Sequence, residues 1–153
     1  MRSRGCGLII NIGSMGGILG LPFQSSYCSS KFALEGLSES MRMELQRFGV
    51  NVVLIDPGDF NTNITQNRLY LDSCMTDSPY RAEFDKAMSI MRRSENRGPS
   101  PEIIARLVGR IMSKSSPRVR YHPGPMSQRI IPLLKKWLPA RVSEKLIMMN
   151  YGL

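Results

Sequence analysis

Two short apolar runs flank one long helical pattern near the start of the chain, and this order constrains the fold more than any other feature. The run Gly7–Gly13 is almost continuously apolar, which predicts a short strand covered on both faces. Val50–Asp56 predicts a second strand, which Pro57-Gly58 ends. Between the strands, a helix is predicted over 26–48, with Gly49 as its terminating residue. This order predicts two parallel strands joined by a right-handed crossover.

The predicted long helix has one apolar stripe, whose members recur at steps of three and four residues. The stripe consists of Leu34, Leu37, Met41, Leu45 and Phe48. The rest of the chain predicts a polar loop over 59–79 and several shorter elements. These are helices over 80–93, 100–114, 127–137 and 140–150, and a short strand over 119–121. We therefore predict an α/β fold with a parallel sheet, organised as a single domain over 1–153.

The charge of the chain is strongly positive and uneven. The formal net charge is +9, and residues 101–153 hold ten Lys/Arg against two Glu. Such a region can meet nucleic acid, an anionic membrane or an acidic partner. The basic residues are spread over several predicted elements, and no aromatic residues are interleaved for base stacking. We therefore expect a solvated helical surface rather than a nucleic-acid interface.

Cysteine usage and hydropathy limit the compartment and the kinds of site. The three cysteines, Cys6, Cys28 and Cys74, have no metal-ligand spacing, so neither a disulfide scaffold nor a metal site is predicted. A reducing compartment, and hence a cytoplasmic location, fits this usage. The uncharged stretch from Gly5 to Ser30 has a concentrated apolar run only of strand length, so we expect no targeting segment and no membrane span.

Tyr27 and Lys31 lie four residues apart at the start of the predicted long helix. This spacing places both side chains on one helical face. A free tyrosine has a pKa of about 10, and a neighbouring ammonium favours the phenolate. We therefore expect Lys31 to lower the pKa of Tyr27, so that Tyr27 can exchange a proton with an alcohol or carbonyl oxygen. The pair alone is weak evidence, because an ordinary helix start with a solvated lysine has the same pattern.

Ser14 makes the pattern more specific, because it follows the first predicted strand directly and precedes Tyr27 by thirteen residues. The ends of parallel strands and the start of the following helix share one rim of a sheet, where ligands bind in such folds. The run Asn11-Ile12-Gly13-Ser14, then Tyr27 and Lys31, resembles the short-chain dehydrogenase/reductase family. The resemblance continues through Pro57-Gly58 to Thr62, and the matching motifs span residues 7–62.

The resemblance implies a function and a role for each matching residue. It implies an NAD(P)-dependent oxidoreductase that transfers a hydride between a nicotinamide, as NAD or NADP, and a small alcohol or carbonyl substrate. Tyr27 would be the general acid/base, Lys31 would hold the nicotinamide ribose, and Ser14 would bind the substrate oxygen. Pro57, Gly58 and Thr62 would line the nicotinamide site. The family often builds a homo-oligomer through the long helix, and apolar residues near Phe23 suggest an apolar substrate.

The resemblance covers the C-terminal half of the family's fold. The family's phosphate loop, Thr-Gly-x-x-x-Gly-x-Gly, its Asn-Asn-Ala-Gly segment and its catalytic Asn do not occur in this sequence. The expected fold is thus a partial Rossmann-type, doubly wound parallel sheet without the nucleotide-binding half. Residues 1–65 would form the catalytic βαβ segment and residues 66–153 the substrate region. We expect this chain alone to be inactive and to bind no NAD(P)H.

Two alternatives to an enzyme remain open from the sequence. One is a non-catalytic fragment or interaction module that pairs through the long helix. The other is a basic binder of nucleic acid or of a membrane surface, which would use residues 101–153 and would show a steep salt dependence.

Overall fold

A computed structural model describes residues 1–70 and 78–153 of the chain. The sheet has three parallel strands in the order β1 (Gly7–Ile12), β2 (Val50–Ile55) and β3 (Arg120–Tyr121). The strands β1 and β2 pair in register from Gly7 opposite Val50 to Ile12 opposite Ile55, so both end at the same level. The predicted strands and their parallel order are confirmed.

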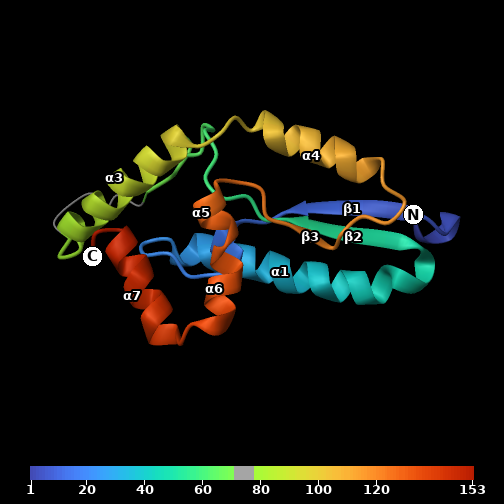
Figure 1. Cartoon of the computed structure of the whole chain (residues 1–153), viewed down its shortest axis with the longest axis horizontal. Helices are drawn as coiled ribbons and strands as arrows, with labels where there is room; N and C mark the ends of the chain where they lie inside the picture. Colours follow the sequence, from blue (N-terminus) through green and yellow to red (C-terminus); the bar gives the residue numbers. More distant parts are fainter. Residues whose placement is uncertain (71–77) are drawn as a thin grey trace.

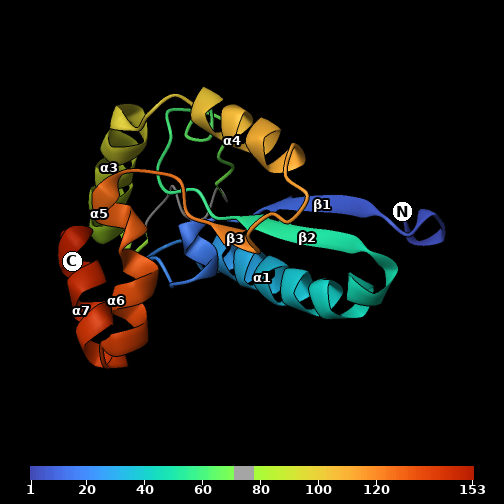
Figure 2. The same ribbon diagram turned by 45° about the vertical axis from the view of Figure 1, so that its right-hand side comes forward.

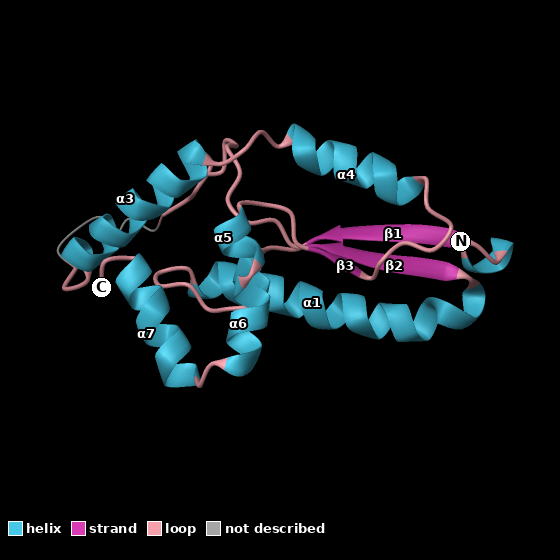
Figure 3. Ribbon diagram, in the orientation of Figure 1, coloured by secondary structure: helices cyan, strands magenta, loops and turns pink. Residues whose placement is uncertain are grey.

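Helices lie on both faces of this sheet (Figures 1 and 3). The long helix α1 (Ser25–Leu45) covers one face and continues into a short 3-10 turn, η3 (Gln46–Phe48). Helix α4 (Glu102–Met112) covers the other face, where Ile111 packs against Val53 and Ile55 in a fully buried cluster. This arrangement confirms the doubly wound α/β class.

The apolar stripe predicted for α1 is right only in part. Leu34, Met41 and Leu45 are half-buried, whereas Leu37 is 53% exposed. The residue that lies fully buried in the middle of the helix is Ser38, whose hydroxyl accepts a 2.8 Å hydrogen bond from the Asn11 amide of β1. The face that meets the sheet is therefore rotated away from Leu37, because a polar contact anchors it.

The remaining α-helices form the end of the molecule opposite the N-terminus (Figures 1 and 2). They are α3 (Arg81–Arg97), α5 (Met126–Arg129), α6 (Ile131–Trp137) and α7 (Ala140–Asn150). The 3-10 turns η1 (Arg2–Arg4) and η2 (Met15–Gly17) precede and follow β1. Where one helix was predicted over 127–137, the structure has α5 and α6. Pro132 lies in the first turn of α6, and a proline is tolerated there but not inside a continuous helix.

Two further predictions concern helix α3 and the loop before it. Helix α3 extends to Arg97, four residues beyond the predicted end at 93, and stops where Gly98 leaves the helical conformation. The predicted loop over 59–79 is irregular at 59–70, whereas its part at 71–77, which includes Cys74, lies outside the described residues.

Gly49 offers a test of how the βαβ unit closes. It has a φ of 64°, and a Cβ atom there would lie 2.2 Å from the carbonyl oxygen of Gly5. We expect Gly49→Ala to lower the free energy of unfolding by about 2 kcal/mol or more, because the left-handed conformation alone costs an L-residue roughly 1–2 kcal/mol. Gly36→Ala in α1 is the control, since its Cβ would meet no atom within 4 Å. It should raise stability by about 0.5–1 kcal/mol in urea unfolding. Similar destabilisation by both changes would contradict this account.

Candidate active site

A wide cavity of about 1840 Å³ lies at the carboxyl ends of β1 and β2. Its walls come from the loops after these strands, the first turns of α1, helix α3 and the C-terminal helices α5–α7. All six residues predicted for the site line it: Ser14, Tyr27, Lys31, Pro57, Gly58 and Thr62. The topological argument that placed them on one rim of the sheet therefore agrees with the structure.

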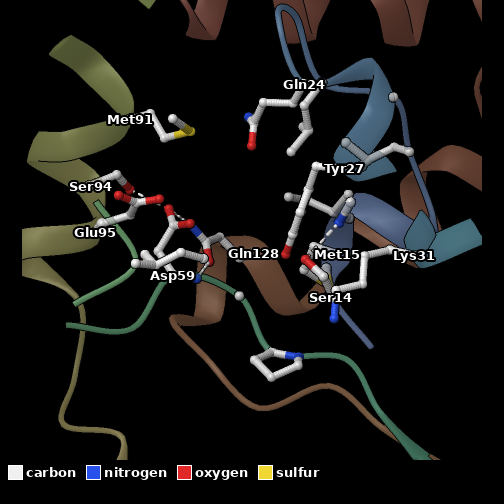
Figure 4. A pocket seen from close by; sticks show the side chains of 18 of the residues that line it. Ser14, Met15, Gln24, Tyr27, Lys31, Asp59, Met91, Ser94, Glu95 and Gln128 are labelled. Carbon is white, nitrogen blue, oxygen red and sulfur yellow. Dashed lines mark hydrogen bonds between the residues drawn. The ribbon is translucent and has the colours of Figure 1, made fainter. Parts of the chain in front are cut away.

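Ser14 and Tyr27 face one another on the wall of this cavity (Figure 4). Ser14 follows β1 in an extended conformation and caps η2, where its hydroxyl accepts a 3.1 Å hydrogen bond from the Gly16 amide. Gly16 in turn brings the turn close to the tyrosine, because a Cβ atom there would lie 3.0 Å from Tyr27 Cε1. The absence of a side chain at residue 16 thus lets the serine turn and the phenol ring pack together.

The electrostatics of Tyr27 differ from the prediction. Burial raises the pKa of Tyr27 above its ordinary value, and a hydrogen bond with the Ser14 side chain lowers it in part. Lys31, which was predicted to lower this pKa, donates a 3.0 Å hydrogen bond to the Ile12 carbonyl oxygen and lies 5.9 Å from the centroid of the tyrosine ring. The ammonium therefore lies over the ring and is held by the end of β1. In this structure Tyr27 is a neutral phenol at pH 7.

Pro57, Gly58 and Thr62 line the cavity in the segment that follows β2. The carbonyl oxygen of Pro57 accepts a 3.1 Å hydrogen bond from the Met15 amide, which ties the loop after β2 to the turn after Ser14. At Gly58 a Cβ atom would lie 2.1 Å from the Gln128 amide oxygen, so α5 approaches this backbone closely. The Thr62 hydroxyl accepts from the Ile64 amide at 3.3 Å.

A second polar group faces Ser14 and Tyr27 from the opposite wall, and the sequence analysis assigned none of its residues to the site (Figure 4). Asp59 accepts hydrogen bonds from the Ser94 hydroxyl and from the Gln128 amide, the latter at 2.6 Å. Gln128 also accepts from the Asp59 backbone amide at 2.8 Å. Beside them Glu95, which is buried, forms a 2.9 Å ion pair with Arg68. Only the position of Asp59 directly after Pro57-Gly58 could have indicated a role for one of them.

Asp56 forms a buried charge cluster directly beneath the Ser14 turn. Its carboxyl group is fully buried, and a Cβ atom on Gly13 would lie 2.1 Å from its Oδ1 atom. Arg120 Nε and His122 Nδ1 approach its Oδ2 atom at 3.7 and 3.5 Å, and Arg120 also pairs with Glu35 of α1. Burial and the neighbouring Glu35 raise the pKa of Asp56 to about 8. Burial and the Arg120 charge lower the pKa of His122, which therefore adds no positive charge at pH 7.

This shift predicts how stability depends on pH. The folded chain holds a proton on Asp56 up to about pH 8, whereas the unfolded chain releases it near pH 4, at the ordinary pKa of about 3.9. Stability from this group is therefore complete below pH 4 and falls as the pH rises from 4 to about 8. Asp56→Asn, which keeps the shape and carries no charge, should flatten this decline in thermal melts recorded across that range. Identical pH profiles for the variant and the parent would contradict the assignment.

No metal-binding group of three His, Cys, Asp or Glu side chains occurs in the described parts of the chain. Within the same residues, none of the helices is both long and apolar enough to cross a bilayer.

Comparisons with known proteins match this chain to one family. The sequence model of one protein family, described as short chain dehydrogenase, matches residues 1–70. The chain is 34% identical over 153 residues to the 3-ketodihydrosphingosine reductase of Bacteroides thetaiotaomicron, covering all of this chain and 57% of that protein. It is 33% identical over 139 residues to human 17-beta-hydroxysteroid dehydrogenase type 1, covering 88% of this chain and 42% of that protein.

Solved structures agree with the fold. A short-chain dehydrogenase from Streptomyces avermitilis, 25% identical, superposes with a TM-score of 0.64 over 94% of this chain and 54% of that one. A family member from Burkholderia phymatum, solved in complex with NAD and 20% identical, gives a TM-score of 0.67. The chain thus spans about half the length of the relatives that it matches. With its motifs, its parallel sheet and these relatives, the chain belongs to the short-chain dehydrogenase/reductase family.

Proposed function

We propose that this chain carries the proton-transfer half of an NAD- or NADP-dependent oxidoreductase that interconverts an alcohol and a carbonyl compound. The observation that carries the proposal is the pair of hydroxyl groups of Ser14 and Tyr27, which share a hydrogen bond at the cavity wall. Two hydroxyls that meet at one point can both contact a single substrate oxygen. The name of the Bacteroides relative, a reductase, supports the same class of reaction.

Tyr27 is the proposed general acid/base. In the reducing direction its hydroxyl donates a proton to the carbonyl oxygen as that oxygen gains negative charge, and in the oxidising direction the phenolate removes the alcohol proton. Ser14 donates a hydrogen bond to the same oxygen and stabilises the charge that develops on it. The Gly16 amide donates to the Ser14 oxygen, so the serine keeps its own proton for a second hydrogen bond, which a bound substrate oxygen would share with Tyr27.

The residues near Tyr27 fit the nicotinamide end of the cofactor. Lys31 has three N–H donors and uses one on the Ile12 carbonyl oxygen, which leaves two for ribose hydroxyl groups. Pro57, Gly58 and Thr62 offer backbone and one hydroxyl on the adjacent wall. When bound, the nicotinamide supplies or accepts the hydride. The described residues offer no glycine-rich turn at the start of a helix that suits the pyrophosphate.

The proposed substrate is an apolar alcohol or ketone of steroid-like or lipid-derived type. Met15, Leu19, Leu21 and Phe23 line the cavity on the side of the Ser14 turn. Across from them, Met88 and Met91 of α3 add flexible apolar side chains to the wall. The human relative is named as a hydroxysteroid dehydrogenase and the Bacteroides relative as a reductase of a lipid, which is consistent with such a lining.

The test uses the chain in two forms. In the first, the 153-residue chain is titrated with NADH and NADPH, and we expect no micromolar binding in nicotinamide fluorescence. In the second, the chain is joined behind the nucleotide-binding half of the Bacteroides relative, and this form is called the completed enzyme. We expect it to oxidise NADH or NADPH in the presence of apolar ketones. A completed enzyme that folds and binds the cofactor but transfers no hydride to or from any such compound would contradict the proposal.

Further properties of the whole enzyme are part of the same proposal. Helix α1 exposes Phe32, Leu37 and Met43, which favours a homo-oligomer that forms through this helix. A cytoplasmic location agrees with the two free cysteines, Cys6 and Cys28, among the described residues. If the completed enzyme is inactive but dimeric, the alternative of an interaction module gains the support that the oxidoreductase loses.

A further inference from the structure

The outer faces of the C-terminal helices combine exposed apolar side chains with basic ones. Ile130, the N-cap of α6, is followed by Leu133 and Trp137 at steps of three and four residues, which places these side chains on one side of α6. Met126 begins the neighbouring helix α5. All four are exposed, Leu133 by 64% and Trp137 by 78%. This stripe is too apolar for a helix face whose only function is to meet water.

Helix α7 repeats the pattern. Val142 and Met149 are exposed and lie on one side of the helix with Lys145, at steps of three and four residues. Met148 and Arg141 flank this line. We call the outward residues of α5, α6 and α7 together the C-terminal outer face. It consists of Met126, Arg129, Ile130, Leu133, Lys136, Trp137, Arg141, Val142, Lys145, Met148 and Met149.

The charge on this face has a single sign. Its charged members are Arg129, Lys136, Arg141 and Lys145, and Glu144 is the one acidic side chain in residues 126–153. Glu144 lines the cavity, but it lies three residues after Arg141 and four before Met148, so it borders the outer face, whose four basic side chains outnumber it. No ion pair of Lys136, Arg141 or Lys145 is found within the residues that the structure describes. The face therefore presents uncompensated positive charge beside apolar groups.

The inner sides of the same helices form a wall of the cavity. Leu134 and Leu138 of the α6 region and Ile147 of α7 line it. The helices α5–α7 form one end of the molecule, away from the sheet, in both views (Figures 1 and 2). A surface that binds the outer face would thus lie one helix diameter from the cavity.

We propose that the C-terminal outer face docks on an anionic membrane surface. Helices of this length cannot cross a bilayer, but amphipathic helices with Lys and Arg among Trp, Leu and Met lie well in its interface. The long basic side chains extend to lipid phosphates while their stems and the apolar residues enter the acyl boundary. The anionic character of the partner follows from the single sign of charge on the face. This binding does not depend on the proposed oxidoreductase activity.

Trp137 provides a direct probe, because it is the only tryptophan in the chain. The 153-residue chain is mixed with vesicles of phosphatidylcholine alone or with one third phosphatidylglycerol, and binding is measured by co-sedimentation. With anionic vesicles we expect sedimentation, a blue shift of the tryptophan emission and protection from iodide quenching. With phosphatidylcholine alone we expect none of these.

Two pairs of variants separate the outer face from net charge and from hydrophobicity in general. The triple variant Lys136→Gln, Arg141→Gln, Lys145→Gln should lose roughly 100-fold in partitioning, at about fivefold per basic residue. The matched triple variant Arg106→Gln, Arg110→Gln, Lys114→Gln removes the same charge from α4 and its end and should keep most of the binding. Likewise Leu133→Ser should weaken binding, and Met112→Ser, exposed by 67% on α4, should not.

Each result decides the proposal, once circular dichroism shows that the variants are folded. Loss of binding in the outer-face variants alone supports it. Equal loss in both triple variants would mean that net charge attracts the chain without a specific face, and equal binding to both vesicle types would exclude charge recognition; either overturns it. A blue shift that grows with protein concentration in the absence of vesicles would identify a second copy of the chain as the partner and would also overturn it.

Discussion

Replacing Tyr27 by phenylalanine is expected to lower kcat of the completed enzyme by about 1000-fold, while the fold stays intact. The change removes only the hydroxyl that shares a hydrogen bond with Ser14, and it leaves the ring that packs against Gly16. Without that hydroxyl the substrate oxygen would lose its proposed proton donor. The measurement is steady-state oxidation of the nicotinamide with an apolar ketone, accompanied by a thermal melt. Tyr80→Phe is the control, because Tyr80 is exposed at the start of α3 and should not change kcat.

The same group sets the direction of the pH dependence. Because burial raises the pKa of Tyr27 above 10, the phenol stays protonated at neutral pH and can donate a proton for carbonyl reduction. Alcohol oxidation needs the phenolate, so its rate should keep rising as the pH increases to about 10. A plateau near pH 7 would show that Tyr27 has the lowered pKa first expected from Lys31. Retention of most activity in Tyr27→Phe would remove Tyr27 from the mechanism altogether.

Ser14→Ala is expected to lower kcat of the completed enzyme by about 100-fold, with a smaller effect on KM. The serine hydroxyl stabilises charge on the substrate oxygen most strongly in the transition state, so its loss acts on the chemical step. The variant also loses the hydrogen bond from the Gly16 amide, and the cost in stability is about 1 kcal/mol.

A matched variant separates these two effects. Ser100 makes the same kind of local bond, since its hydroxyl accepts from the Glu102 amide at 3.3 Å, and it does not line the cavity. Ser100→Ala should therefore lose similar stability and no activity. If both variants lower kcat alike, the role of Ser14 is structural.

The sequence predicted the elements that rest on local patterns. The βαβ unit follows from the apolar runs at Gly7–Gly13 and Val50–Asp56, and Gly49 ends the helical segment in the left-handed conformation expected of it. The split at Pro132 and the rotation of α1 away from Leu37 were missed. Predicting the split requires knowing how the chain turns before Pro132. Predicting the rotation of α1 requires the hydrogen bond between Ser38 and Asn11, which lie 27 residues apart.

The candidate site likewise has residues that local patterns predict and contacts that they do not. Ser14, Tyr27 and Lys31 could be placed together because strand ends and a helix start share one rim of the sheet. The bond between Asp59 and Gln128 joins residues 69 apart, and no local pattern predicts it. The predicted direction of the Tyr27 pKa shift was also wrong. The spacing to Lys31 suggested a lowered pKa, whereas burial by the assembled walls of the cavity raises it.

The strands β1 and β2 end at the same level, and the cavity beyond them has one wall from the early part of the chain and one from the later part. The residues proposed for proton transfer, Ser14, Tyr27 and Lys31, all lie in the segment between Gly7 and Gly58. The facing wall of the cavity comes from later residues such as Ser94 and Gln128. Changes in the later segment can therefore alter which molecule is accepted without rebuilding the chemistry. Lineages that share this βαβ unit can diversify their substrates by remodelling only what faces it.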